Sequence, residues 1–361
     1  MPYFLAMKSS LAVLLFAAAI SACASTSQPS QSLSPAPQAN LESLITETEI
    51  RRVLSTLAHD SMEGRYTGSR GANKSAAFIA GELKAIGLKP AGDSGTYMQK
   101  VPFARVTSTR RGTTLKLLDS IGALAAVPDT ARVVGYNVIG VMPGTDPVLK
   151  NEIVAFAAHY DHLGIGKPVN GDSIYNGADD DASGVTTVLA IARAFAQTSP
   201  PKRTIMFMLT TGEEEGILGT RWYVDHPSFP LSSMVAEMEV EMAGRPDSLA
   251  GGRGRLWMTG YDRSTMGSTL KTAGIPIVAD PYPQYKFFER SDNIVFALKG
   301  IPAHTLSSYN LHQDYHAPTD EVSRIDFTHL TEIARAAYQA ARLLADGAAP
   351  RWNPGGQPTP R

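Results

Sequence analysis

The chain has 361 residues, and its 33 Lys and Arg residues against 34 Asp and Glu residues leave a formal net charge of −1. This balance gives no electrostatic case for a nucleic-acid partner. With 43% hydrophobic and 19% charged residues, the composition is that of a globular protein with a large core, which excludes a disordered or fibrous chain.

The N-terminal segment has the features of a bacterial export signal. Lys8 precedes the apolar run Leu11–Ile20, which is too short to span a bilayer. The run leads into Ile-Ser-Ala-Cys, a spacing that resembles the lipobox of bacterial lipoproteins, and Cys23 is the chain's only cysteine. We therefore predict a signal peptide over residues 1–22 and a lipid anchor at Cys23. The anchor would hold the protein in the cell envelope, facing the periplasm on the outer membrane. The alternative is ordinary secretion of a soluble protein.

The segment after the cysteine contains no charged residue as far as Asn40 and almost no bulky apolar side chain. Such a composition cannot bury enough surface to fold, so residues 23–40 are predicted to form a flexible tether. Because no composition break occurs within residues 41–346, one domain is predicted there. The Gly- and Pro-rich residues 347–361 are predicted to be a disordered tail.

Helical and strand-like patterns alternate through the predicted domain. Near-continuous apolar strands that alternate with amphipathic helices indicate an α/β fold, here a three-layer sandwich with a mostly parallel mixed sheet covered by helices on both faces. The helices are predicted at Glu47–Leu57, Gly71–Ile86, Ser183–Gln197 and His329–Leu344. The strands are predicted at Asn137–Met142, Ile153–Ala158, Thr204–Leu209, Met234–Val240, Leu256–Thr259 and Ala303–Leu306.

Residues of metal-ligand type follow several of these strands directly. In an open α/β sheet, ligands bind beyond the carboxyl ends of the strands, so these segments are expected to converge on one pocket. Several carboxylates in one pocket repel each other, and a pair of divalent cations removes that repulsion. The segments are His159–Gly164, Asn176–Gly184, Thr210–Gly216, Glu241–Arg245 and Asp314–Asp320.

These segments resemble the motifs of the M28 family of zinc aminopeptidases, in the family's order. The matching motifs are His-x-Asp at His159, Gly-Ala-Asp-Asp-x-Ala-Ser-Gly at Gly177–Gly184, Gly-Glu-Glu-x-Gly at Gly212–Gly216 and Tyr-His-x-Pro-x-Asp at Tyr315–Asp320. The resemblance extends over about residues 41–346. Many relatives insert a protease-associated domain after a Pro-Phe segment, but here only about thirty residues separate Phe103 from the next strand, which predicts that this domain is absent.

The resemblance implies two zinc ions per chain and a peptide substrate with a free N-terminus. It assigns His159 and Glu241 to the first zinc, Asp180 as the bridge, and Glu214 and His316 to the second zinc. Position 241 is usually Asp in the family, so Glu241 is a departure. Glu239 lies two residues earlier on the same side of the strand and is a second candidate. Glu241 is chosen because it lies nearer the strand's carboxyl end and fits the family register.

Three further residues receive catalytic roles by the same resemblance. Glu213 would be the general base and then the general acid, Asp161 would orient His159, and Tyr315 would stabilise the oxyanion. The remaining histidines are expected to be structural or exposed, and only His162 and His312 are close enough in sequence to the motifs to touch the ligands.

Two other functions stay open at this stage. One is glutaminyl cyclisation by a single-zinc enzyme of the same fold, which a metal count would distinguish. The other is a tethered binding lipoprotein without activity. Retention of Glu213, which a mere metal-binding site does not need, favours an enzyme.

Overall fold

A computed structural model describes residues 40–108 and 112–359, which belong to one compact unit. The predicted signal peptide, Cys23 and the tether up to residue 39 lie outside the described residues. In the two described ranges, no helix is both long enough and apolar enough to cross a membrane.

The main sheet has ten strands in the described ranges, and its order is β11-β10-β12-β9-β5-β8-β4-β2-β3, with β1 paired to β4. Its centre, β8-β5-β9-β12, is parallel, while β4, β2 and β3 are antiparallel to their neighbours. The strands are β1 (Lys89–Pro90), β2 (Met98–Ser108), β3 (Gly112–Leu117), β4 (Arg132–Met142), β5 (Ile153–His159), β8 (Thr204–Thr210), β9 (Met234–Val240), β10 (Leu256–Met258), β11 (Ile277–Ala279) and β12 (Ala303–Ser307). A separate hairpin pairs β6 (Gly164–Val169) with β7 (Asp172–Tyr175).

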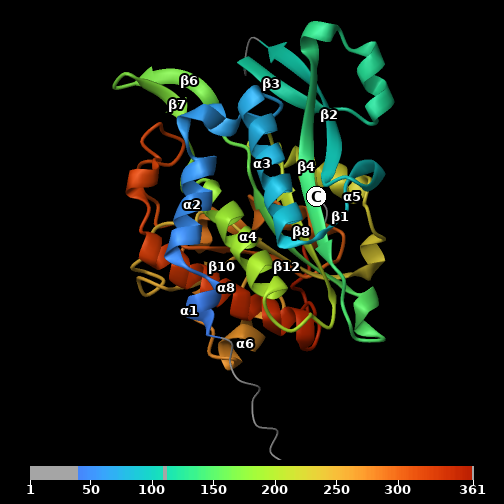
Figure 1. Cartoon of the computed structure of the whole chain (residues 1–361), viewed down its shortest axis with the longest axis vertical. Helices are drawn as coiled ribbons and strands as arrows, with labels where there is room; N and C mark the ends of the chain where they lie inside the picture. Colours follow the sequence, from blue (N-terminus) through green and yellow to red (C-terminus); the bar gives the residue numbers. More distant parts are fainter. Residues whose placement is uncertain (1–39, 109–111, 360–361) are drawn as a thin grey trace, which may run out of the picture. The chain divides into compact units, whose positions relative to one another are not determined.

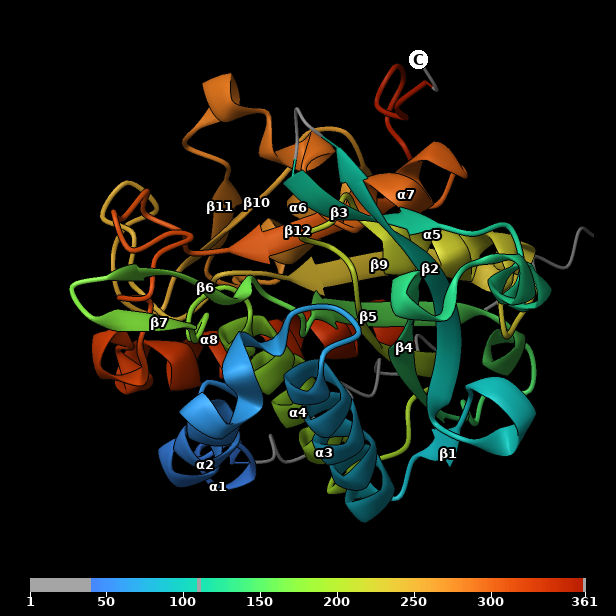
Figure 2. The same cartoon turned by 90° about the horizontal axis from the view of Figure 1, so that it is seen from above.

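Helices cover both faces of this sheet. α2, α3, α4 and α8 lie on one face, and α5 and α7 lie on the other (Figures 1 and 2). The predicted three-layer α/β sandwich is confirmed, with parallel pairing at the centre of the sheet and between β10 and β11 at one edge. The helices are α1 (Leu41–Leu44), α2 (Glu47–Leu57), α3 (Arg70–Ile86), α4 (Ala182–Ala196), α5 (Leu218–Asp225), α6 (Thr265–Thr272), α7 (Asn293–Leu298) and α8 (Phe327–Asp346).

The central strands are buried on both faces, which explains their continuous apolar sequence. In β5, Phe156 packs into the core under α4 and α8, and its neighbours Ala155 and Ala157 pack into the core under α5 and α7. α4 is buried almost all round, and its N-terminus is capped by Asp181, whose carboxylate accepts a hydrogen bond from the Gly184 amide at 2.9 Å. The helix start that carries the Asp motif is therefore held rigidly against the sheet.

One flank of the sheet is antiparallel. β2 and β3 form a hairpin there, and β4 returns beside β2. The described residues between Phe103 and Tyr136 form most of this hairpin, two short 3-10 helices and the start of β4.

The prediction of a disordered tail is wrong for residues 347–359. The indole Nε1 of Trp352 donates a hydrogen bond to the Gly300 carbonyl at 2.9 Å, and the side chain of Asn353 donates to the Asp262 carbonyl at 2.8 Å. Trp352 also forms a β-bridge with Ser264, the cap of α6. The composition of the tail is typical of disorder, but one aromatic anchor and a few backbone contacts order it.

Candidate metal centre

Three strands and two loops supply the residues of the candidate site. Because β8, β5 and β9 are adjacent and parallel, their carboxyl ends lie at the same edge of the sheet. The sequence-predicted side chains lie together there: His159 at the end of β5, Asp180 before α4, Glu213 and Glu214 after β8, Glu241 after β9, and His316 in the loop before α8.

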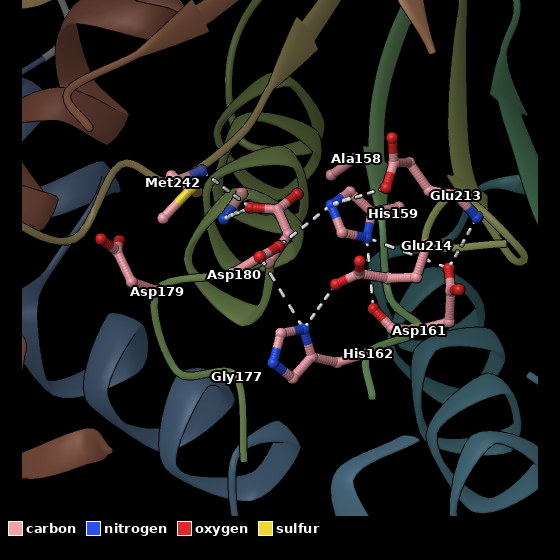
Figure 3. Close-up of polar contacts among 12 residues, drawn as sticks. Ala158, His159, Asp161, His162, Gly177, Asp179, Asp180, Glu213, Glu214 and Met242 are labelled. Atoms are coloured by element: carbon pink, nitrogen blue, oxygen red, sulfur yellow. Dashed lines mark hydrogen bonds and ion pairs between the residues drawn. The ribbon is translucent and has the colours of Figure 1, made fainter. Parts of the chain in front are cut away.

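His159, Asp180 and Glu241 form the first of two groups that could hold a metal ion. Their ligand atoms all lie within 4.8 Å of one another. The Nε2 atom of His159 lies 3.3 Å from Oδ1 of Asp180, as Figure 3 shows, and His159 is fully buried. The backbone amide of Glu241 donates to the Leu306 carbonyl at 3.0 Å, which ties the residue to β12.

The second group is His162, Asp180 and Glu214, and His316 lies beside it. The Nε2 atom of His316 lies 3.2 Å from Oδ2 of Asp180 and 3.1 Å from Oε2 of Glu214. On the same side, Nδ1 of His162 lies 2.7 Å from Oε1 of Glu214. Asp180 therefore stands between two histidines with one carboxylate oxygen toward each.

These separations fit bound zinc. Two ligand atoms at about 2.0–2.1 Å from a tetrahedral zinc ion lie about 3.3 Å apart. The three distances that join Asp180, Glu214 and the two predicted histidine ligands are 3.1–3.3 Å. In addition, the buried Nε2 atom of His159 has no hydrogen-bond partner among the described residues. A buried ring nitrogen without a partner, facing carboxylates, is the chemistry of a metal ligand.

Glu213 faces the same space without belonging to either group. Its Oε2 atom lies 4.0 Å from Nε2 of His159, and its backbone amide donates to Oδ1 of Asp161 at 3.2 Å (Figure 3). Asp161 is itself buried, and it accepts a hydrogen bond from the Thr67 hydroxyl at 2.9 Å. Asp161 also lies beside His159, with 3.9 Å between its Oδ1 and the ring's Nδ1. It therefore contacts both the predicted base and a predicted ligand.

The two candidate glutamates, Glu239 on β9 and Glu241 just after it, have different surroundings. Glu239 is fully buried, lies opposite Ala157 of β5, and accepts a hydrogen bond at 2.9 Å from the amide of Asn293, at the start of α7. Glu241 instead lines the cavity and belongs to the first metal group. The structure thus places Glu239 below the site and brings Glu241 to it.

The cavity beside this group has a volume of about 50 Å³. Tyr315 lines it and stacks on the ring of His316, with ring centroids 3.8 Å apart. Burial raises the pKa of Tyr315 above its ordinary value, so the phenol stays protonated and can donate a hydrogen bond. The other residues that line the cavity, apart from the candidate ligands and Glu213, are Met242, Trp257, Thr259, Phe287, Arg290, Thr305, Ser307 and Tyr309.

A buried ionic network to which sequence reasoning assigned no role supports the ligand loops. Arg245 pairs with Asp314 at 2.7 Å and with Asp320 at 3.2 Å. The Asp320 carboxylate accepts hydrogen bonds from the amides of Asp179 and Asp180. Both Arg245 and Asp320 stand in segments that carry motifs, but their partners lie about 70 to 140 residues away.

The six remaining histidines divide into three pairs. His162 and His312 contact the site, because His312 Nε2 lies 2.9 Å from the carboxylate of Asp179. His304 and His329 are buried with neutral partners, the hydroxyls of Ser264 and Ser308. The other two, His59 and His226, are exposed.

Comparison with known proteins agrees with this geometry. A family model described as peptidase family M28 matches residues 137–341, more than half of the chain. The chain belongs to peptidase family M28. Its predicted family is confirmed.

The individual relatives and solved structures have low sequence identity to this chain. Probable leucine aminopeptidase 2 of Aspergillus oryzae is 30% identical over 173 residues, which make up 46% of this chain and 32% of that protein. The chain thus spans about a third of that relative's length.

Two solved structures share the fold. BSAP, a zinc aminopeptidase from Bacillus subtilis, superposes with a TM-score of 0.61 at 15% identity, covering 84% of this chain and 96% of BSAP. Porphyromonas gingivalis glutaminyl cyclase superposes with a TM-score of 0.57 at 14% identity, covering 82% of this chain and 98% of the cyclase. At these identities the likeness establishes the fold alone.

Proposed function

We propose that this protein is a dizinc aminopeptidase that removes N-terminal residues from peptides. The position of Asp180 carries the proposal. Its two oxygens lie 3.3 Å and 3.2 Å from the nitrogens of His159 and His316. A carboxylate shared in this way is the arrangement of a bridging ligand between two metals. Glu241 and Glu214 would each complete one of the two sites.

Hydrolysis would need both the metals and the protein's own groups. Zinc ions bound here would lower the pKa of a water molecule and polarise the peptide carbonyl. Glu213 takes a proton from the water as the water oxygen bonds to the carbonyl carbon of the peptide. Glu213 then passes this proton to the peptide nitrogen as the C–N bond breaks. Asp161 accepts a hydrogen bond from the backbone amide of Glu213 and so fixes the position of Glu213. The Tyr315 hydroxyl donates a hydrogen bond to the developing oxyanion.

The lining of the cavity is consistent with removal of a terminal residue. Beyond the candidate ligands, the aromatic side chains of Trp257, Phe287 and Tyr309 line a space of about 50 Å³. We propose that this space receives the side chain of the terminal residue. The substrate class we propose is therefore a peptide with a free N-terminus.

Glutaminyl cyclisation is the second candidate, because the P. gingivalis cyclase shares the fold. A single zinc would leave one of the two ligand groups without a metal. With that zinc in the second group, His159 and Glu241 would face Asp180 without a cation of their own, which favours the dizinc proposal.

The deciding experiment measures zinc per chain together with hydrolysis of aminoacyl chromogenic substrates. We expect two zinc ions, hydrolysis that a strong chelator abolishes, a lower melting temperature after chelation, and recovery of both on adding zinc. Hydrolysis that continues after verified metal removal would refute the mechanism. One zinc with cyclisation of N-terminal glutamine would favour the cyclase, and two zinc ions with no hydrolysis would favour a binding protein.

A further inference from the structure

His162 lies between the two loops that carry the second metal group. Its side chain has no solvent exposure, and its Nδ1 atom is 2.7 Å from Oε1 of Glu214 and 3.9 Å from Oδ2 of Asp180 (Figure 3). Three residues with a ligand atom in reach, His162, Asp180 and Glu214, form a group that could itself hold a metal. The role of His162 therefore has to be decided between direct binding and support.

Distances between ligand atoms distinguish direct metal binding from support of another ligand. Atoms that share one tetrahedral zinc ion lie about 3.3 Å apart. The contacts of His316 with Asp180 and Glu214, at 3.2 and 3.1 Å, agree with that value. The 2.7 Å contact of His162 with Glu214 is too short for two ligands of one zinc, but it has the length of an N–H···O⁻ hydrogen bond. The 3.9 Å distance to Asp180 is too long for a shared ion.

The two oxygens of Glu214 consequently have different partners. Oε2 faces His316, the predicted zinc ligand, while Oε1 faces His162. A donor on Oε1 leaves Oε2 as the oxygen available to a metal, and it fixes the rotation of the carboxylate about its last bond.

Gly177 holds the ring in this orientation. It has a positive φ of +54°, and a Cβ atom there would lie 2.6 Å from the ring carbons of His162 and 2.1 Å from the carbonyl oxygen of Asp180. The imidazole thus packs against the bare backbone of the loop that carries Asp180. The amide of His162 also donates to the Arg65 carbonyl at 3.3 Å. A ring confined on these sides has little freedom to turn toward a metal.

We propose that His162 is a positioning residue for the second zinc ion, and that it acts by donating its Nδ1–H to Oε1 of Glu214. This inference rests on the dizinc site proposed above. It predicts that the donor, not the ring's capacity to bind metal, is what the second site requires.

The test compares His162→Asn with His162→Leu. These two side chains have nearly the same shape, and the Asn amide nitrogen is attached to Cγ just as Nδ1 of histidine is, so only Asn keeps the donor. Zinc is titrated against a chelating indicator to obtain separate affinities for the two ions. Cobalt(II) is titrated in parallel, and its absorption spectrum reports the ligands of each ion. His226→Leu, which changes an exposed histidine that stacks on Trp222 away from the cavity, is the matched control.

We expect His162→Leu to weaken the second zinc about 10–100-fold and to leave the first unchanged, because loss of a group that orients a ligand has this size of effect. His162→Asn should restore most of the affinity, and saturated cobalt spectra should match in all variants. Equal losses in both variants, or a changed cobalt spectrum, would make His162 a ligand and overturn the proposal, as would unchanged affinity in His162→Leu.

Two controls keep the result interpretable. A circular dichroism spectrum shows whether His162→Leu is folded, and if it is not, His162→Phe, which keeps a ring without a donor, replaces it in the comparison. Loss of the first zinc from a folded variant would overturn the proposal. If the unmodified protein itself binds fewer than two zinc ions, the dizinc function fails before the role of His162 is tested.

Discussion

Glu213 and Glu214 are consecutive in the chain, yet their surroundings shift the pKa values of their carboxyl groups in opposite directions. Burial raises the pKa of Glu213 well above its ordinary value, and the nearby carboxylate of Glu241 adds to the effect. Burial acts on Glu214 too, but hydrogen bonds from His162 and His316 hold its pKa below the ordinary value. Neighbouring carboxyls with separated pKa values suit different tasks, which agrees with the roles proposed above, proton transfer for Glu213 and metal binding for Glu214.

Glu213→Gln should therefore keep both zinc ions and lose most activity. Removal of a general base costs roughly 10²–10⁴ in kcat, while the amide retains the shape of the side chain. Zinc per chain and kcat on an aminoacyl substrate are measured together. Glu215→Gln is the control, since Glu215 accepts hydrogen bonds from Tyr66 and Leu115 and touches neither metal group. Loss of a zinc ion in Glu213→Gln would show that Glu213 is a ligand.

At the scale of elements, the acidic residues on β9 and just after it stand at alternate positions, so they share one side of the strand and differ in their distance from its carboxyl end. Glu237 and Glu239 lie on the face toward α7, and both are fully buried. Burial raises the pKa values of both carboxyls well above the ordinary range, and the nearby Asp292 raises them further. Only Glu241, beyond the end of the strand, reaches the cavity.

This arrangement predicts different results for the same substitution on β9 and just after it. Glu241→Gln should lower the zinc content from two ions to one and remove most activity. Glu239→Gln should leave two ions in place, because an amide replaces a carboxyl group that burial already keeps protonated. Metal analysis of the two variants checks the assignment. One ion in Glu239→Gln with two in Glu241→Gln would reverse it.

The loop that carries His316 depends on Arg245. This guanidinium pairs with Asp314 and Asp320, and Asp320 is fully buried. Arg245→Met would leave Asp320 without its cation. Removing one partner of a buried pair costs about 3–5 kcal/mol, so we expect the free energy of unfolding in urea to fall by about that amount. A change below about 1 kcal/mol, the range of exposed pairs, would show that the network contributes little.

At the scale of the whole molecule, we propose separate tasks for the folded domain and the N-terminal segment. We propose that Cys23 is lipidated and holds the domain at the cell envelope, facing the periplasm, while the segment from Ala24 to Asn40 serves as its tether. Support for this comes from the sequence features of the segment, which lies outside the described residues. The described domain itself contains no helix that could cross a membrane.

The anchor is tested by Cys23→Ser in a bacterial host. The variant should move from the membrane fraction to the soluble fraction, because it lacks the thiol that accepts the lipid, and hydrolysis per molecule should stay the same. Fractionation with and without detergent, followed by immunoblotting, measures the distribution. If the variant still requires detergent for release, lipidation at this position is refuted.

Much of this fold and site could be predicted from local patterns in the chain. The helix predicted at Glu47–Leu57 matches α2, and the strand predicted at Met234–Val240 matches β9. The period of the hydrophobic residues is a local property of the sequence, so it can be recognised without knowledge of the fold. The ends of the parallel strands could likewise be located, which brought His159, Glu214 and Glu241 to one edge of the sheet before any distance was known.

What only the tertiary structure decided depends on partners that are distant in the chain. The donor role of His162 rests on a contact with Glu214, 52 residues away, and the loop around Asp180 is held by Asp320, 140 residues away. The tail is ordered by Trp352 against Gly300, 52 residues before it. A sequence pattern reports which side chains can form such contacts, but the distances that separate a zinc ligand from a hydrogen-bond donor arise only when the chain packs.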